Sequence, residues 1–336
     1  MAHLAATERQ HVRTVDFARG VCAIGVCAYH ILYYERIANL EIISLYAVYA
    51  FFVISGFAMY VAYRNRLADN QSLRTYFLRR FWRIAPLFYT ANLIHLFLRP
   101  ADFSVGKLVL NGMLALGLAN PGTTSIVTGG WSIGIEMVFY ILFPGILAAA
   151  ASRIRHLALL FGTALIAQFA FVNQLYASGN FDWVLYTQPI AFVGYFVAGC
   201  LLGEIYRRFP IWKGAGWWFV VAALALVPFA VVEAPTSVDL LIGWRGALLT
   251  LATIILITAV AFMPEPAGLV DPIAQWFGRM SYPIYLTHPL AYIWVSQNIT
   301  GAGSSTRLVI TVAITVALSE VVHRGIERPA IRYSRG

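Results

Sequence analysis

The run IISLYAVYAFFVISGFAMYVAY, residues 42–63, decides the fold class, because it is predominantly apolar and carries no charged side chain. A helix needs about 20 such residues to cross the hydrocarbon core of a bilayer. Similar runs fill most of the chain, so we expect an all-α, polytopic membrane helix bundle. The ten predicted spans are Val15–Tyr34, Ile42–Tyr63, Ile84–Leu98, Ser132–Ala150, Leu157–Tyr176, Pro189–Tyr206, Trp217–Val232, Arg245–Met263, Pro283–Ile299 and Arg307–His323.

Composition supports this class. Of 336 residues, 60% are hydrophobic and 12% are charged, and that charged fraction is about half of what a soluble domain carries. We therefore expect one integral-membrane domain over residues 1–336. The net charge of +9 lies in short loops, which is the pattern that orients spans in a bilayer. No separate basic face with stacking aromatic residues is visible, so we exclude a nucleic-acid partner.

The distribution of basic residues predicts the topology. Arginines or lysines follow the second, fourth, sixth and tenth predicted spans, whereas the loops 177–188, 233–243 and 300–306 contain neither. The run Lys107–Ala119 is only about 13 residues long, and a full crossing there would move the later basic loops outside. We therefore predict that Ser104–Gly130 is re-entrant or lies at the outer side. The N-terminus (1–13) and the C-terminal tail (324–336) are then both cytoplasmic.

The three cysteines, Cys22, Cys27 and Cys200, all lie in apolar runs and show no metal-type spacing. We expect small buried packing residues, no disulfide and no metal site. Cys27 lies three residues before His30, so a Cys–His nucleophile pair stays open as an alternative.

Ionisable side chains inside a span are candidates for function, because burying them is costly. Arg19 and His30 are 11 residues apart, which is close to three helical turns, so both face the same way about 16 Å apart along the axis. This arrangement suits a long substrate with an anionic head and a reactive tip, such as acyl-coenzyme A. His30, if buried, would be neutral near pH 7 and able to accept a proton from a hydroxyl. The alternative is a hydrogen-bonded structural histidine.

Two further stretches carry candidate residues. In RRFWRIAPL, residues 79–87, Arg80 and Arg83 share one helix face, and paired guanidinium groups bind phosphate well. The alternative is positive-inside charge with snorkelling side chains. In FFVISGF, residues 51–57, Ser55 and its glycine neighbour would permit close helix packing.

The last two stretches begin predicted spans. WSIGIEMVFY, residues 131–140, places Ser132 at a helix start and Glu136 one turn inside. Glu136 needs a partner there, and could orient His30, bind the acceptor or pair with an arginine. SYPIYLTH, residues 281–288, offers hydroxyl and imidazole groups that we expect at the cytoplasmic mouth, with an aromatic belt as the alternative: Tyr282, Tyr285 and His288.

Together these stretches resemble the membrane acyltransferase-3 family. The resemblance rests on five motifs in order: Arg19-x10-His30, Phe-Phe-x-x-Ser-Gly-Phe at 51–57, Arg-Arg-x-x-Arg-Ile-x-Pro at 79–86, Trp-Ser-x-x-x-Glu-x-x-Phe-Tyr at 131–140, and Ser-Tyr-x-x-Tyr-Leu-x-His at 281–288. No single motif is specific, but five in order across nearly the whole chain are. The closest likeness is to the short bacterial polysaccharide O-acetyltransferases, which would place the chain in the bacterial cytoplasmic (inner) membrane.

The resemblance implies transfer of an acyl group, usually acetyl, from acyl-coenzyme A to a hydroxyl of an exported glycan or its lipid-linked precursor. Some family members carry an extra SGNH-type domain. The sequence in hand shows none, so we expect transfer to finish within the bundle or with a partner. The resulting assignment is His30 and Glu136 for catalysis, Arg19, Arg80, Arg83, Tyr282, Tyr285 and His288 for the donor, and Ser55, Trp131 and Ser132 for the acceptor.

Two other classes of function remain at this stage. Intramembrane arginine, histidine and glutamate also suit a transporter or flippase, although no inverted repeat is visible. A receptor or assembly scaffold would tolerate changes at Arg19 and His30. We favour direct transfer over a covalent acyl-enzyme, with His30 as general base. A homodimer is left open.

Overall fold

The chain is described here by a computed structural model that covers residues 12–67, 70–150, 153–179 and 181–334. Over these ranges it is helical and contains no strand. The long helices are α1 (Arg13–Tyr34), α2 (Glu41–Tyr63), α3 (Asn70–Leu98), α6 (Gly130–Ala150), α7 (Ile154–Ala177), α9 (Val193–Arg208), α10 (Trp217–Val231), α11 (Gly243–Phe262), α12 (Val270–Asn298) and α13 (Ser304–Val322).

Short helices join the long ones. They are α4 (Val105–Gly112), α5 (Pro121–Thr124), α8 (Trp183–Tyr186), α14 (Arg328–Tyr333), the 3₁₀ turns η1 (Pro100–Asp102), η2 (Leu116–Leu118), η3 (Pro189–Ala191), η4 (Pro210–Trp212) and η5 (Val238–Leu240), and the π-helical turn η6 (His323–Glu327).

Each of the ten predicted spans coincides largely with one long helix. Six helices in the described part of the chain are long and apolar enough to cross a membrane: α1, α2, α6, α7, α11 and the segment that begins with α13. Many large apolar side chains on α7 and α10 are exposed, such as Leu159, Ile166 and Leu224. A soluble protein would bury side chains of this kind, so the chain is an integral membrane protein. Which side of the membrane each terminus occupies stays a prediction, and residues 1–11 and 335–336 lie outside the described ranges.

One predicted helix start was wrong. Pro283 was placed at the beginning of a span, but α12 begins at Val270 and Pro283 lies inside it. Pro86 likewise lies inside α3, which begins at Asn70. A proline removes only one backbone hydrogen bond, and membrane helices tolerate it where neighbouring groups satisfy the freed carbonyl. The polar turns before each proline therefore continue the helix, and α12 runs deeper than expected.

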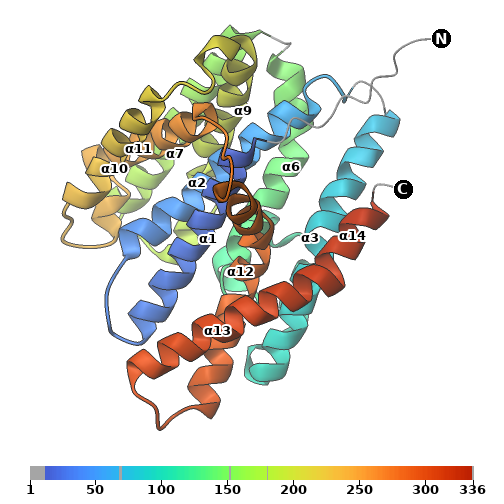
Figure 1. The fold of residues 1–336 in the computed structure, drawn as a ribbon, viewed down its shortest axis with the longest axis vertical. Helices are drawn as coiled ribbons and strands as arrows, with labels where there is room; N and C mark the ends of the chain where they lie inside the picture. Colours follow the sequence, from blue (N-terminus) through green and yellow to red (C-terminus); the bar gives the residue numbers. More distant parts are fainter. Residues whose placement is uncertain (1–11, 68–69, 151–152, 180, 335–336) are drawn as a thin grey trace.

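The helices form two groups around a shared centre. In Figure 1, α1, α2 and α12 lie in the middle, α7, α9, α10 and α11 on one side, and α3, α13 and α14 on the other. Contacts are most extensive between α1 and α12 and between α2 and α9. Both pairs use glycine at the crossing. A Cβ on Gly56 would overlap the carbonyl oxygen of Phe196, and one on Gly20 would lie 2.5 Å from the Cβ of Phe277. Small residues allow such close approach between membrane helices.

The segment 104–130 does not form a long helix, in agreement with the prediction that it does not span. Its backbone is held by Asn111, whose side-chain amide donates to the carbonyls of Lys107 and Thr124, each at 2.7 Å. Asn92 of α3 accepts from the backbone amide of Val127 at 3.3 Å. These hydrogen bonds satisfy polar groups of the irregular backbone, which lipid could not do. They lead the chain into the start of α6, which carries part of the site.

Candidate active site

One cavity opens at the centre of the bundle, with about 810 Å³ of empty space, part of which is open to solvent. Five helices line it, namely α1, α2, α3, α6 and α12. Eight of the eleven predicted site residues lie on its wall: Arg19, Ser55, Arg80, Arg83, Ser132, Glu136, Tyr282 and Tyr285. Stretches more than 250 residues apart in the sequence therefore converge on one space, as a shared substrate site requires.

Arg80 is the unneutralised cation of this cavity. Its guanidinium lies 5.5 and 5.6 Å from the ring centres of Tyr63 and Tyr140, and it donates to the Tyr63 hydroxyl at 3.3 Å. Its Nε is buried and has no hydrogen-bond partner. Among the described residues, no carboxylate lies within ion-pair distance of it. A partly buried cation without a counter-charge carries a desolvation cost, and an anionic ligand would relieve that cost.

Arg83 differs from Arg80, although the sequence predicted a matched pair. Its guanidinium lies 3.0 Å from a carboxylate oxygen of Glu327, which is 1% exposed. His323 Nδ1 lies 2.6 Å from the other oxygen of the same carboxylate. His323 begins and Glu327 ends the π-helical turn η6, which places Glu327 against Arg83. Glu327 was not predicted from the sequence, because nothing local links it to α3.

Arg19 lines the same cavity, and its guanidinium lies 3.7 Å from Asp16 on the preceding helical turn. This distance is long for an ion pair and both side chains are partly exposed, so the interaction is weak. Arg19 and Arg80 therefore present positive charge to the same space from α1 and α3.

Glu136 is bound by hydroxyl groups rather than by an arginine. Ser55 donates to its Oε1 at 2.8 Å, and Tyr140 donates to the same oxygen at 2.5 Å. No ion pair to Glu136 and no hydrogen bond from His30 to it occur within the described ranges. Of the three partners considered for Glu136, neither an arginine nor His30 is present. Glu136 is therefore a polar group in the cavity wall, where it can contact an acceptor hydroxyl.

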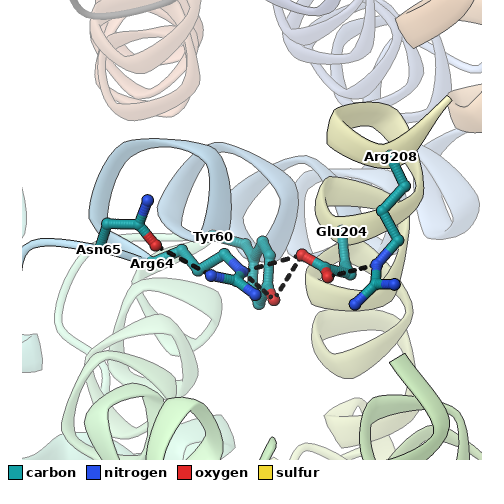
Figure 2. Close-up of polar contacts among 5 residues, drawn as sticks. All are labelled: Tyr60, Arg64, Asn65, Glu204 and Arg208. Atoms are coloured by element: carbon teal, nitrogen blue, oxygen red, sulfur yellow. Dashed lines mark hydrogen bonds and ion pairs between the residues drawn. The ribbon is translucent and has the colours of Figure 1, made fainter. Parts of the chain in front are cut away.

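A second buried carboxylate shows what a purely structural arrangement looks like. Figure 2 shows Glu204 of α9 between Arg64 and Arg208, at 2.9 and 2.6 Å, with the Tyr60 hydroxyl donating at 2.9 Å. Two cations and a hydroxyl satisfy this carboxylate away from the cavity. Glu204 therefore links α9 to α2 and stands apart from the cavity.

Tyr285 and Ser132 close one end of the cavity. Their hydroxyl oxygens lie 2.8 Å apart, and each also lies within hydrogen-bond distance of the Gly129 carbonyl, at 3.2 and 2.9 Å. Gly129 has φ +83°, and a Cβ there would lie 3.0 Å from the Tyr285 hydroxyl. Glycine is therefore needed where segment 104–130 meets α12. The Tyr282 hydroxyl instead donates to the carbonyl of Ile84 at 2.8 Å, which ties α12 to α3.

His30 lies just beyond this end, against His288. The two rings join through His30 Nδ1 and His288 Nε2 at 2.8 Å, with ring planes 12° apart. Neither imidazole lines the cavity itself. Its wall there is Tyr285, whose ring centre lies 6.2 Å from that of His288.

His288 is therefore not on the cavity wall with the three arginines, and its expected role in donor binding stays a prediction. Because α12 begins at Val270 rather than at Pro283, His288 lies about 27 Å along it at 1.5 Å per residue. The α1–α12 contact fixes the register. Gly278 meets Asp16 in the same region where Gly20 meets Phe277. His30 meets His288 ten residues beyond Gly20 on α1 and eleven residues beyond Phe277 on α12.

Two other candidates lie outside the cavity. Trp131 packs against Trp183 and Phe192, with ring centres 5.5 and 5.6 Å away, so its predicted contact with the acceptor is not visible in this geometry. Cys27 and Cys200 are buried, Cys22 is partly buried, and all three are free thiols. No hydrogen bond joins Cys27 to His30 within the described part of the chain, so a Cys–His pair gains no support.

Residues 12–324 match the acyltransferase-3 family, described as an acyltransferase domain. The chain belongs to this family. The match covers nearly all of the sequence, as the five motifs predicted. The acyltransferase-3 chain is 24% identical to the peptidoglycan O-acetyltransferase OatA of Listeria monocytogenes over 96% of its own length and 56% of OatA. It is 25% identical to the exopolysaccharide production protein ExoZ of Rhizobium meliloti, over 90% of its length and 94% of ExoZ.

A third relative is an uncharacterised protein of Haemophilus influenzae, 29% identical over 41% of this chain and 64% of that protein. The chain therefore spans only about half of OatA but most of ExoZ. No solved structure matches the chain significantly. The family assignment made from the five motifs is confirmed.

Proposed function

We propose that this chain is a membrane O-acyltransferase that moves an acyl group, in the first instance acetyl, from acyl-coenzyme A to a hydroxyl of an exported glycan or its lipid-linked precursor. The observation that carries the proposal is the central cavity, in which Arg80 has no carboxylate partner among the described residues and a histidine pair lies behind Tyr285. The names of OatA and ExoZ support acetyl as the group and a polysaccharide as the acceptor.

The donor is held by its charge. Coenzyme A carries phosphate groups at one end and the thioester at the other, and guanidinium groups bind phosphates by charge-assisted hydrogen bonds. Arg80 supplies the charge that has no carboxylate partner among the described residues, Arg19 supplies a guanidinium only weakly paired with Asp16, and Arg83 supplies a guanidinium held in place by Glu327. The thioester then extends toward Tyr285 and Ser132, at the end of the cavity that adjoins the histidine pair.

The acceptor reaches the same end past segment 104–130, because Gly129 at its edge contacts Tyr285. His30 removes the proton of the acceptor hydroxyl as its oxygen attacks the thioester carbonyl. The C–S bond then breaks, the acetyl group stays on the acceptor oxygen, and the thiolate leaving group takes the proton back from His30. A general base of this kind contributes about 10²–10⁴-fold to the rate. Glu136, with Ser55 and Tyr140, provides polar contacts along the path.

The test uses the purified protein in lipid nanodiscs with acetyl-coenzyme A and membrane glycan from the same cells. We expect thiol release that depends on the acceptor, together with an added acetyl mass on the glycan. His30→Ala should abolish both, and His156→Gln on α7, away from the cavity, should change neither. Full activity in His30→Ala would overturn the assignment of the base. Substrate counterflow without any change in the acyl group would instead indicate the transporter alternative.

A further inference from the structure

His30 and His288 form the end of a hydrogen-bonded chain that starts on the backbone of α12. His288 Nδ1 lies 3.0 Å from the carbonyl oxygen of Ile284, and His288 Nε2 lies 2.8 Å from His30 Nδ1. The His288 ring is 1% exposed, so water does not compete for either contact. The backbone oxygen is one turn earlier on the same helix, and its position is therefore fixed by α12 itself.

The donors and acceptors in this hydrogen-bonded series determine which nitrogen of each imidazole carries a hydrogen. A carbonyl oxygen can only accept, so His288 Nδ1 carries the hydrogen and donates it to Ile284. A neutral imidazole has one N–H, which leaves His288 Nε2 with a lone pair. His30 Nδ1 must then donate to that lone pair, so the single hydrogen of His30 sits on Nδ1. The other nitrogen of His30, Nε2, is left with the free lone pair.

Neither ring has an acidic partner that would hold a second proton. Within the described ranges, no carboxylate lies within hydrogen-bond distance of His30 or His288. Tyr29 and Tyr34 contact the His30 ring, and Tyr285 contacts the His288 ring. The neutral pair with one N–H on each ring is therefore the resting state.

We infer that His288 is a positioning residue that fixes the tautomer of His30, so that Nε2 of His30 is the atom that takes the acceptor proton. The inference rests on the proposed function for what that base does. When Nε2 gains the proton, His30 becomes an imidazolium whose Nδ1–H donates to His288 Nε2, and a charge-assisted hydrogen bond is stronger than a neutral one. His288 thus takes the part that an aspartate has in a Ser-His-Asp triad, without bringing a negative charge near the thioester.

The variants separate this role from packing. His288→Phe keeps the ring volume but removes the acceptor for His30 Nδ1–H. His288→Gln places an amide oxygen where Nε2 lies, and that oxygen can accept the same hydrogen. We expect His288→Phe to lower kcat by about 100-fold or more, the range of a lost general base, with KM for acetyl-coenzyme A unchanged. We expect His288→Gln to recover most of that loss. Equal loss in both variants, or full kcat in His288→Phe, would refute the positioning role.

A spectroscopic readout tests the tautomer without turnover. ¹⁵N-histidine labelling in nanodiscs, with His30→Gln used to assign the signals, distinguishes a protonated Nδ1 from a protonated Nε2. We expect His30 to be protonated at Nδ1 in the native protein and to shift toward Nε2 in His288→Phe. Protonation of native His30 at Nε2 would overturn the inference even if acetyl transfer is observed. Absence of transfer with the expected tautomer would instead refute the proposed function alone.

Discussion

Replacing Arg80 and Arg83 by leucine, one at a time, should separate two arginines that the sequence makes look equivalent. Arg80 has a buried Nε without a partner and no carboxylate among the described residues, whereas Arg83 is paired with the buried Glu327. The first substitution removes an uncompensated charge. The second leaves a buried carboxylate without its cation.

The two stability changes should therefore differ. Removing one partner of a buried ion pair costs about 3–5 kcal/mol. Arg83 is about one-third exposed, so we expect the lower end, about 3 kcal/mol, for Arg83→Leu. For Arg80→Leu the lost cation–π contacts, about 1 kcal/mol each, are offset by relief of the buried charge. We expect its stability to stay within about 1 kcal/mol of the native protein, or to rise.

The ligand response should be the reverse. A hydrogen bond to a charged group contributes about 1.5–3 kcal/mol, so Arg80→Leu should weaken the binding of coenzyme A by about 10- to 150-fold. Thermal unfolding in nanodiscs, measured over a coenzyme A titration, gives both quantities in one assay, because a ligand that binds only the folded state raises the transition. The added variant Arg83→Leu with Glu327→Gln should recover part of the stability lost in Arg83→Leu.

The role proposed for Arg80 is refuted if Arg80→Leu lowers the unfolding temperature as far as Arg83→Leu does while keeping the native affinity for coenzyme A. That result would mean that Arg80 stabilises the fold and that its charge is neutralised by something other than the donor. A double variant at Arg83 and Glu327 no more stable than Arg83→Leu alone would show that the ion pair does not link α3 to η6.

Two further predictions concern packing and pH. A Cβ on Gly199 would overlap the carbonyl oxygen of Val53, so Gly199→Ala should destabilise the α2–α9 contact by about 3 kcal/mol or more. A Cβ on Gly145 meets nothing within 4 Å, so Gly145→Ala should leave the stability unchanged. Equal melting temperatures for the two variants would contradict the α2–α9 contact. Burial raises the pKa of Glu35, but hydrogen bonds and the charge of Arg307 outweigh it and hold that pKa below the usual 4.5. A lowered folded-state pKa adds stability above about pH 4.5 that is lost as the pH falls, so native thermal stability should drop below this pH more steeply than that of Glu35→Gln.

Much of the site could be predicted because helical periodicity and cost of burial act locally. Arg19, Ser55, Glu136 and Tyr285 each lie in an apolar run where a polar group needs a reason, and all four line the cavity. The fold class followed from the same runs, because only a helix satisfies its own backbone inside lipid.

The parts that could not be predicted depend on contacts across the fold. The position of His288 along the bundle depends on where α12 begins. Pro283 suggests a helix start, but thirteen residues of α12 precede it, and the sequence around Pro283 does not indicate them. The pairing of Glu327 with Arg83 joins residues 244 positions apart through a π-helical turn that has no sequence pattern. Trp131 was assigned with its motif neighbours, but its side chain packs against Trp183 of α8 and Phe192, which follows η3.

The contrast between Glu204 and Arg80 gives the physical basis for locating the donor. Both are ionisable groups inside the bundle, Glu204 buried and Arg80 partly buried. Among the described residues, Glu204 contacts two arginines and a hydroxyl, whereas Arg80 contacts one hydroxyl and two aromatic faces. A fold that needed only stability would gain by replacing Arg80 with an apolar side chain. An anion in the cavity would stabilise this charge, and the cost in the unliganded protein would then become part of the affinity for the proposed donor. We therefore expect the charge on Arg80, more than the number of arginines nearby, to determine which end of the cavity receives the donor phosphates.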